Sequence, residues 1–322
     1  MARLFLSAVL VAAIIGVAPV MAQDGFPTKP IRIIIPIPVG SAPDVLVRLV
    51  GEQLAGLLRQ PVIIENRPGG RGIIAAQAVT AASPDGYTLL GGVTSIFTIL
   101  PAEKAGLPFD VNRDFAQIGL IQRAPPYIAV PSRLGVGSLP ELIALAKSRP
   151  HEIVIGTNGT GTLPHFAALA LAKMGNIPIT VVPYATGGSA AVITDILGGR
   201  VQAVIDGLAV LRGTLQSGDL KLIAVMSPER DPSFPDLPTV AETVPRLTAV
   251  GWMSLSAPAG TPGHIVRRLN EGLRRVLEMP SINHHFDELG AQVKIMTPAE
   301  TKAFIEGEQK LWWPIVKEAG IE

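Results

Sequence analysis

The sequence contains no cysteine among its 322 residues, which excludes disulfide bonds, zinc–thiolate sites and a cysteine nucleophile. Charged residues are also scarce, at 16%. The 27 basic residues nearly balance the 26 acidic ones and form no basic cluster, so the sequence does not favour a nucleic acid as partner. A mean hydropathy of +0.40 with 33 glycines and 29 prolines excludes both a disordered polyelectrolyte and a coiled coil. What remains is a globular chain long enough for two domains.

The first 22 residues have the pattern of a secretory signal peptide. Arg3 precedes an uncharged apolar stretch, residues 4–17, and Ala18-Pro19-Val20-Met21-Ala22 places small residues before a cut at Gln23. The stretch is short for a membrane span, although an uncleaved anchor is the alternative. Because no cysteine follows that could carry a lipid, we expect the mature protein to reside in the periplasm.

Short β-branched runs alternate with helical patterns in two series. In the first, strands at residues 31–35, 61–65 and 87–93 alternate with helices at 45–58 and 73–82, an order typical of a parallel α/β sheet. In the second, strands at 127–130, 153–155, 179–183, 201–205 and 220–225 alternate with helices at 164–174, 189–197 and 209–216, and Ser138 to Glu141 form a capping box that opens a further helix. A strand at 252–257 follows, and Thr261-Pro262 and Thr297-Pro298 are expected to start two amphipathic helices, each with a threonine N-cap.

The two series predict two lobes. The C-terminal segment has few strands of its own, so we expect it to pack on the first sheet. Lobe 1 would then comprise residues 23–123 plus 249–322, and lobe 2 residues 124–248. Two chain crossings, near residues 122–125 and 250–252, would act as hinges beside a cleft between the lobes.

The loops at the carboxyl ends of the strands are the candidate binding site, because ligands of open α/β sheets bind there beside helix N-termini. These loops are rich in Gly, Ser and Thr and nearly free of charge. They offer backbone N–H groups and hydroxyls to an anion, which predicts a carboxylate ligand. The candidates are Val39, Gly40, Ser41, Asp44, Thr94, Ser95, Asn158, Thr160, Gly161, Thr162, His165, Tyr184, Ala185, Thr186, Gly187, Gly188, Ser189 and Asp206. For any single loop, an ordinary turn or N-cap is the alternative.

Two of these side chains have two possible roles each. Asp44 either stabilises the N-terminus of its helix or accepts a hydrogen bond from ligand or water. His165, beside the Gly-rich loop, either packs structurally, the commoner role for such a histidine, or contacts the ligand. The sequence has no dinucleotide fingerprint, phosphate loop, nucleophile elbow or His-x-x-x-His pair, so we predict no cofactor, no metal and no catalytic residue. Trp312 and Trp313 are expected to pack in the core.

Five motifs occur in order over the mature chain. They are Pro27-Thr28-Lys29-Pro30-Ile31-Arg32, Glu65-Asn66-Arg67-Pro68-Gly69, Pro84-Asp85-Gly86-Tyr87-Thr88-Leu89-Leu90, Asp236-Leu237-Pro238-Thr239-Val240-Ala241-Glu242 and Ala257-Pro258-Ala259-Gly260-Thr261-Pro262. Together they resemble the signatures of the tripartite tricarboxylate transporter receptor family, also called Bug proteins.

The resemblance implies a two-lobed α/β fold like that of type II periplasmic binding proteins, with two parallel or mixed sheets flanked by helices. It implies a non-catalytic, monomeric receptor that closes around a small organic carboxylate and delivers it to a permease of one large and one small integral membrane subunit. In the family the loops chosen above hold the carboxylate through backbone amides, hydroxyls and waters.

This chain departs from the family pattern in two loops. Ile37, Val39 and Ser41 replace a Phe, a Pro and a Gly in the first loop, and Ala185 stands where a lysine is usual. Without that lysine a mono- or dicarboxylate is favoured over a tricarboxylate. Two other functions are weighed: presenting ligand to a membrane sensor kinase, and a periplasmic hydrolase or isomerase that uses Asp44, His165 or Asp206.

Overall fold

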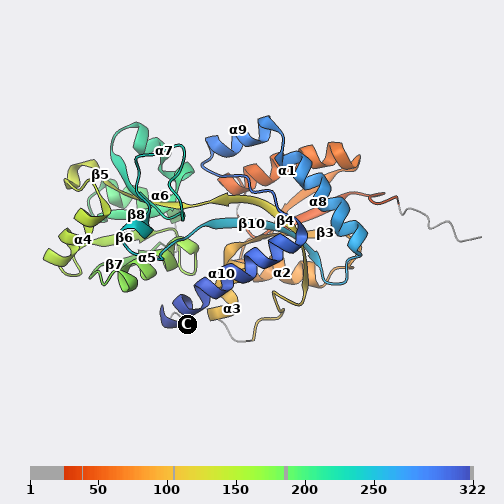
Figure 1. The fold of residues 1–322 in the computed structure, drawn as a ribbon, viewed down its shortest axis with the longest axis horizontal. Helices are drawn as coiled ribbons and strands as arrows, with labels where there is room; N and C mark the ends of the chain where they lie inside the picture. The colour runs from red at the N-terminus through yellow and green to blue at the C-terminus, as the bar shows by residue number, and fades with distance from the viewer. Residues whose placement is uncertain (1–24, 38, 104–105, 185–187, 320–322) are drawn as a thin grey trace, which may run out of the picture.

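The computed structural model describes residues 25–37, 39–103, 106–184 and 188–319 and contains two five-stranded sheets flanked by helices (Figure 1). The strand order is β2-β1-β3-β10-β4 in the first sheet and β7-β6-β8-β5-β9 in the second. In each sheet three neighbouring strands are parallel, and the strand in fourth place is antiparallel to both its neighbours. The predicted two-lobed fold is confirmed, and the two mixed sheets share one topology.

The first sheet combines a predicted parallel part with strands from two distant segments. Its strands are β1 (Ile31–Ile35), β2 (Val62–Asn66), β3 (Thr88–Val93), β4 (Phe115–Ala124) and β10 (Gly251–Pro258). Strand β10 lies antiparallel between β3 and β4, so the first sheet is mixed, one of the two arrangements expected. Strand β4 was not predicted, since Gly119 interrupts its apolar pattern. A Cβ on Gly119 would lie 2.9 Å from Leu273, so the close approach of a helix excludes a larger residue.

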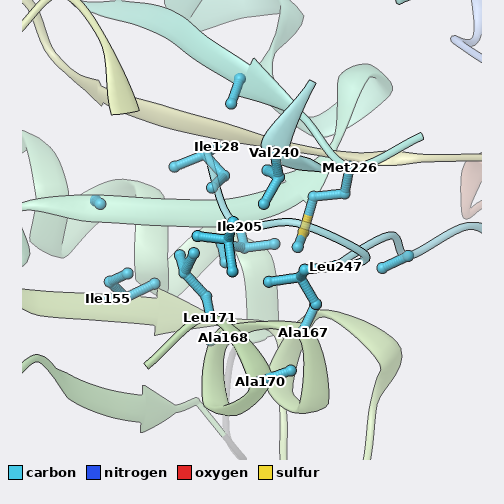
Figure 2. Close-up of a cluster of buried hydrophobic side chains, with 14 of the residues drawn as sticks. Ile128, Ile155, Ala167, Ala168, Ala170, Leu171, Ile205, Met226, Val240 and Leu247 are labelled. Atoms are coloured by element: carbon cyan, nitrogen blue, oxygen red, sulfur yellow. The ribbon is translucent and has the colours of Figure 1, made fainter. Parts of the chain in front are cut away.

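The second sheet follows the predicted strands within two residues. Its strands are β5 (Pro126–Pro131), β6 (Val154–Thr157), β7 (Thr180–Pro183), β8 (Ala203–Gly207) and β9 (Leu220–Val225), and its helices are α4 (Leu139–Ser148), α5 (Leu163–Met174), α6 (Gly188–Leu197) and α7 (Leu208–Gln216). Figure 2 shows Ile128, Ile155 and Ile205 of the sheet facing Ala167 and Leu171 of α5, all at most 1% exposed. The small alanine lets α5 lie close to the strands, which fixes where its N-terminus points.

Helices cover both faces of the first sheet. They are α1 (Ala42–Leu58), α2 (Ile73–Thr80), α3 (Leu100–Glu103), α8 (Gly263–Leu277), α9 (Pro280–Glu288) and α10 (Pro298–Ala319), and the short helical turns of the chain are η1 (Gly70–Gly72), η2 (Ser95–Ile99), η3 (Ser132–Leu134) and η4 (Val240–Glu242). Helices α1, α8 and α9 bury one face of the sheet, and α2 with the first part of α10 buries the other. None of the described helices is long and apolar enough to cross a membrane.

Three predicted helix starts have different outcomes. The Thr297–Glu300 capping box is formed: Glu300 N–H donates to Thr297 Oγ1 at 3.2 Å, and Thr297 N–H donates to Glu300 Oε2 at 2.8 Å. Ser138 Oγ accepts from Glu141 N–H at 3.4 Å, but the Glu141 carboxylate accepts from Gly137 N–H instead of Ser138 N–H. That capping box is therefore only half formed. The N-cap predicted at Thr261 is wrong, because its hydroxyl donates to a preceding carbonyl and the helix begins two residues later.

The chain links the two sheets by more than its two crossings. It passes from β4 to β5 through Pro125 and returns between β9 and β10. In addition, α10 runs from the first sheet to the second (Figure 1), where Trp312 and Val316 enter the hydrophobic core beside α5. The predicted packing of the C-terminal segment on the first sheet therefore describes only part of α10. Trp312 is fully buried. Trp313 is half-buried, and its indole N–H donates a hydrogen bond to Thr98 O at 2.9 Å.

Candidate functional site

The first candidate loop, between β1 and α1, is fixed by the carboxylate of Asp44. This side chain is 2% exposed. Its Oδ2 accepts from Gly40 N–H at 2.8 Å and from Arg48 Nε at 3.1 Å, and its Oδ1 accepts from Asn66 Nδ2 at 2.8 Å. Asn66 also donates to Ile37 O at 3.0 Å, so the loop is tied to the end of β2.

These bonds fit the first of the two roles considered for Asp44, stabilising the start of its own helix. Burial alone would raise the pKa of Asp44, but the hydrogen bonds from Arg48, Asn66 and Gly40 N–H outweigh it and hold the pKa below its usual value. Asp44 is therefore ionised at neutral pH, in the first turn of α1, with its hydrogen bonds directed at its own loop. What the loop presents outward is Val39, 72% exposed, and the main chain at Gly40, whose φ is +81°.

The loop after β3 contains a bond between two strands. The Thr94 hydroxyl donates to Trp252 O at 3.2 Å and accepts from Trp252 N–H at 2.8 Å, and the side chain is buried. Thr94 thus fastens β3 to β10 just where β10 enters the sheet. Ser95 is half-buried and begins η2, a π-helical turn that leads into α3.

On the second lobe, the Gly-rich loop after β6 is held by the side chains that follow it. Thr162 is the N-cap of α5: its Oγ1 accepts from His165 N–H at 3.4 Å and donates to Gly159 O at 2.8 Å. His165, 5% exposed, accepts on Nδ1 from Gly161 N–H at 3.2 Å. Thr160 at the tip of the loop is exposed.

The His165 ring has a structural bond and still faces the other lobe. Burial lowers the pKa of His165, and the negative charge of Glu103 in the first lobe opposes this shift without reversing it. The imidazole is therefore neutral at pH 7, and because Nδ1 is an acceptor, Nε2 carries the proton.

Asp206 joins three of the predicted loops at the end of β8. Its Oδ1 accepts from Asn158 Nδ2 at 3.3 Å and from Gly207 N–H at 2.8 Å, and its Oδ2 accepts from Ser189 Oγ at 2.6 Å. Burial raises the pKa of Asp206, and the bonds from Ser189 and Gly207 only partly offset it. Gly188, with φ of +50°, starts α6 beside this carboxyl.

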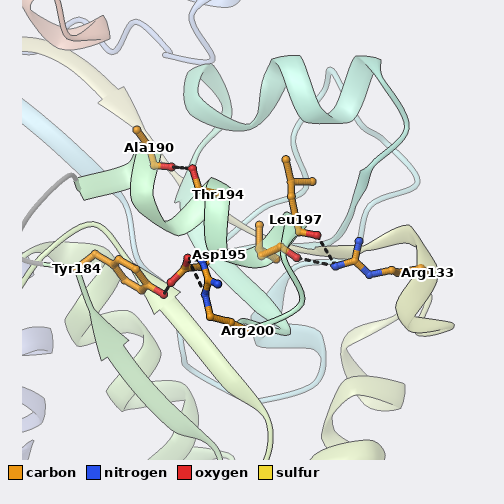
Figure 3. A network of polar contacts seen from close by, with 8 residues as sticks. Arg133, Tyr184, Ala190, Thr194, Asp195, Leu197 and Arg200 are labelled. Atoms are coloured by element: carbon orange, nitrogen blue, oxygen red, sulfur yellow. Dashed lines mark hydrogen bonds and ion pairs between the residues drawn. The ribbon is translucent and has the colours of Figure 1, made fainter.

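Tyr184 points its hydroxyl at α6 (Figure 3). The hydroxyl donates to Asp195 Oδ2 at 2.6 Å, and Asp195 is also paired with Arg200. Burial, followed by the bond to Asp195, raises the pKa of Tyr184 to about 12. Arg133 caps the same, C-terminal end of α6 by donating to the carbonyls of Ile196 at 3.0 Å and Leu197 at 2.8 Å. The predicted candidates Ala185, Thr186 and Gly187 lie outside the described residues.

The sequence analysis missed two charged residues at this site, Arg71 and Glu103. Arg71 Nη1 donates to Glu103 Oε1 at 2.6 Å, and the Glu103 side chain is 3% exposed. The Arg71 guanidinium also lies against the second lobe, since a Cβ built on Gly161 would be 2.5 Å from Nη1. The loop after β2 was not among the candidate loops, which were chosen as rich in Gly, Ser and Thr and nearly uncharged. Its three glycines around one arginine could have identified it as a further candidate.

The lobes therefore meet through the pair Arg71 and Glu103 on one side and the loop of Gly161 and His165 on the other. Three helix N-termini, those of α1, α5 and α6, begin in the candidate loops. In the described part of the chain, no group of three His, Asp or Glu side chains could hold a metal ion. Chemically, the arrangement offers main-chain N–H groups and hydroxyls together with the ion pair of Arg71 and Glu103 between the lobes.

The chain is similar to known proteins over most of its length. The family model described as tripartite tricarboxylate transporter family receptor matches residues 46–321. Protein BugT of Bordetella pertussis is 31% identical over 311 residues, which cover 95% of this chain and 94% of that protein. Among solved structures, R. palustris Rpa4515 with adipate is similar with a TM-score of 0.81 at 32% identity, covering 92% of this chain and 99% of that one.

A second solved structure is similar over nearly the same length. MatC from Rhodopseudomonas palustris, with bound malate, has a TM-score of 0.77 at 27% identity and covers 90% of this chain and all of that one. The family match extends over most of the chain, and the relatives match from end to end. The chain therefore belongs to the tripartite tricarboxylate transporter receptor family of solute-binding transport receptors, the Bug proteins.

Proposed function

We propose that this protein is a periplasmic receptor that captures a small organic carboxylate, a mono- or dicarboxylate, between its two lobes. Lobe 1 is residues 23–123 plus 249–322, and lobe 2 is residues 124–248. The receptor delivers the ligand to a transporter made of one large and one small integral membrane subunit. It acts as a monomer, without a cofactor and without catalysing a reaction.

The feature that best supports the carboxylate is that three of the candidate loops begin helices. The N-termini of α1, α5 and α6 carry orphan N–H groups and the positive end of the helix dipole, and they come from both lobes. An anion among them gains several hydrogen bonds without a dedicated lysine. Rpa4515 and MatC are both at least 27% identical to this chain. Their ligands, adipate and malate, are small organic carboxylates.

Capture follows from a shift between open and closed arrangements of the lobes. A ligand that touches loops of both lobes has its full affinity only when the lobes are closed, so binding favours the closed state. The hinges are the crossings near residues 122–125 and 250–252. A permease that recognises the closed form would then distinguish loaded from empty receptor.

Thermal shift tests the ligand class directly. Residues 23–322 are heated with aliphatic, amino and aromatic carboxylates, with neutral sugars as controls, because binding to the folded state raises the melting midpoint. We expect a shift with at least one acid and none with its methyl ester. Stabilisation by a neutral sugar alone would contradict the carboxylate assignment. NMR of the recovered ligand distinguishes a receptor, which returns it unchanged, from a hydrolase or isomerase.

Export is tested separately, by fractionation of cells that produce the full chain. We expect the protein in the periplasmic fraction, with an N-terminus at Gln23. Protein retained in the membrane fraction with Met1 intact would favour the uncleaved anchor.

A further inference from the structure

The loop after β2 holds an arginine in a backbone conformation that side chains rarely adopt. Arg71 has φ of +54° and is flanked by Gly70 at +54° and Gly72 at +100°. A Cβ on Gly72 would lie 2.6 Å from Ile96, so the loop packs tightly on η2. The Arg71 side chain extends from this position to the other lobe, where its Cδ and Nη1 lie against Gly161.

The target of this side chain is the buried carboxylate of Glu103. Arg71 is 35% exposed and Glu103 is 3% exposed, and only one carboxylate oxygen, Oε1, is bonded to the guanidinium. The pair is pressed against Gly161, where a Cβ would also lie 2.8 Å from Arg71 Cδ. An ion pair of the first lobe therefore forms part of the wall that faces the ligand loop of the second.

The pair places a buried acceptor beside an accessible guanidinium. Among the described residues, no donor reaches the buried Glu103 Oε2. Arg71 donates to Glu103 through Nη1, and its side chain is 35% exposed, so the rest of the guanidinium is accessible. Buried polar atoms in proteins nearly always have a partner, so the unpartnered Glu103 Oε2 beside an accessible guanidinium fits a ligand group that supplies both a donor and an acceptor.

We propose that Arg71 and Glu103 are a specificity-determining pair that selects carboxylates carrying a neighbouring hydrogen-bond donor, a hydroxyl or an ammonium group. This inference rests on the proposed function and names the ligand class more narrowly. The carboxylate of such a ligand accepts from Arg71, and its hydroxyl or ammonium donates to Glu103 Oε2.

Charge balance favours this class over a plain dicarboxylate at the pair. Arg71 and Glu103 together are neutral, so a further carboxylate there would share one guanidinium with Glu103 in a buried setting. A donor on the ligand instead satisfies Glu103. Because a site built for a donor rejects the analogue that lacks it, the pair can discriminate strongly between otherwise identical acids.

Titration calorimetry on wild-type residues 23–322 with matched acids tests the proposal. The pairs are malate with succinate, aspartate with succinate, 2-hydroxyglutarate with glutarate, and lactate with propionate. We expect at least one acid with a donor to bind about tenfold or more tightly than its plain partner. Equal or tighter binding of the plain acid in every pair would overturn the role of the two residues, and this arm needs no variant.

Glu103→Gln then links the preference to the pair. The amide is close in shape to the carboxylate but lacks its charge, so we expect the preference to fall about tenfold while binding of the plain acid is retained. Glu65→Gln is the matched control, since Glu65 pairs with Arg67 at 2.5 Å in the same lobe, away from Gly161. An unchanged preference in folded Glu103→Gln would overturn the proposal. If wild-type protein binds no acid at all, the proposed carboxylate function fails instead.

Discussion

Removing the Asp44 carboxylate tests whether one buried side chain holds the first ligand loop in place. The change is Asp44→Ala. It deprives Gly40 N–H, Arg48 Nε and Asn66 Nδ2 of their acceptor. It also removes a negative charge from the first turn of α1, where the helix dipole favours it.

The expected loss follows from how exposed each donor is. Arg48 is 43% exposed and can turn to water, so its bond contributes little. The bonds from Asn66 and Gly40 to a buried charged acceptor contribute about 1 to 2 kcal/mol each. With the dipole effect, we expect a loss of about 3 kcal/mol in the free energy of unfolding, or roughly 5 °C in the melting midpoint of a chain of this length. Ligand affinity should also fall, because binding must then order the loop.

Urea unfolding followed by circular dichroism measures the loss at pH 7. The pKa of Asp44 lies below its ordinary value of 3.8, so its contribution is present above that value and disappears as the pH falls through the folded-state pKa. The difference between wild type and Asp44→Ala should therefore shrink in acid. Glu306→Ala is the control, since its pair with Lys302 is exposed and 3.9 Å long. A loss below 1 kcal/mol for Asp44→Ala would refute the anchoring role.

Three further changes follow from the structure. Burial raises the pKa of Asp206 above 3.8 in the folded state, so its stabilising effect is complete below that pH and is lost as the pH rises through the folded pKa. Asp206→Asn should accordingly flatten the decline of the urea midpoint as the pH rises above about 4. Tyr184→Phe should lower the free energy of unfolding by about 1 kcal/mol, measured the same way, because it removes the 2.6 Å bond to Asp195. Trp312→Ala should cost about 3 to 5 kcal/mol in urea unfolding and Trp313→Ala clearly less, because only Trp312 is fully buried.

Local patterns predicted most of the fold, because the hydrophobic periodicity of a strand or helix can be recognised within a few residues. Nine of the ten strands were placed within two residues, and the capping box at Thr297 is present as expected. Strand β4 was missed because Gly119 interrupts its apolar pattern. A glycine is present there because α8, more than a hundred residues later in the chain, packs closely against the strand. The direction of β10 was missed for a similar reason, since pairing partners are set by topology rather than by local sequence.

The site was predictable as a set of loops but not as a set of contacts. Strand ends and helix starts identify the loops that hold Gly40, Gly161 and Asp206. Composition could not indicate that Asp44 would turn inward or that the Tyr184 hydroxyl would face Asp195. Arg71 is the clearest case: its partner is 32 residues away and its neighbour Gly161 lies in the other lobe, so only the folded chain brings them together.

The contacts between the lobes differ in the free energy needed to break them. Arg71 lies against Gly161 while still 35% exposed, and Arg212 reaches Asp287 O of α9 only at 3.5 Å, so little free energy opposes breaking either contact. The contact through α10 is different, because Trp312 is fully buried in the second core. Separating it would expose a large apolar surface.

In the proposed opening of the lobes, the end of α10 would stay on the second lobe. Trp312 stays in place while the first part of α10 stays on β4, so any rotation of one lobe against the other has to be absorbed within the helix or at its contacts. Pro314 lies inside α10 two residues after Trp312 and cannot donate a hydrogen bond to the preceding turn, which makes this part of the helix easier to bend. Under the proposed function, the pivot would comprise two strand crossings and one helix, and the candidate loops would lie among the contacts that separate.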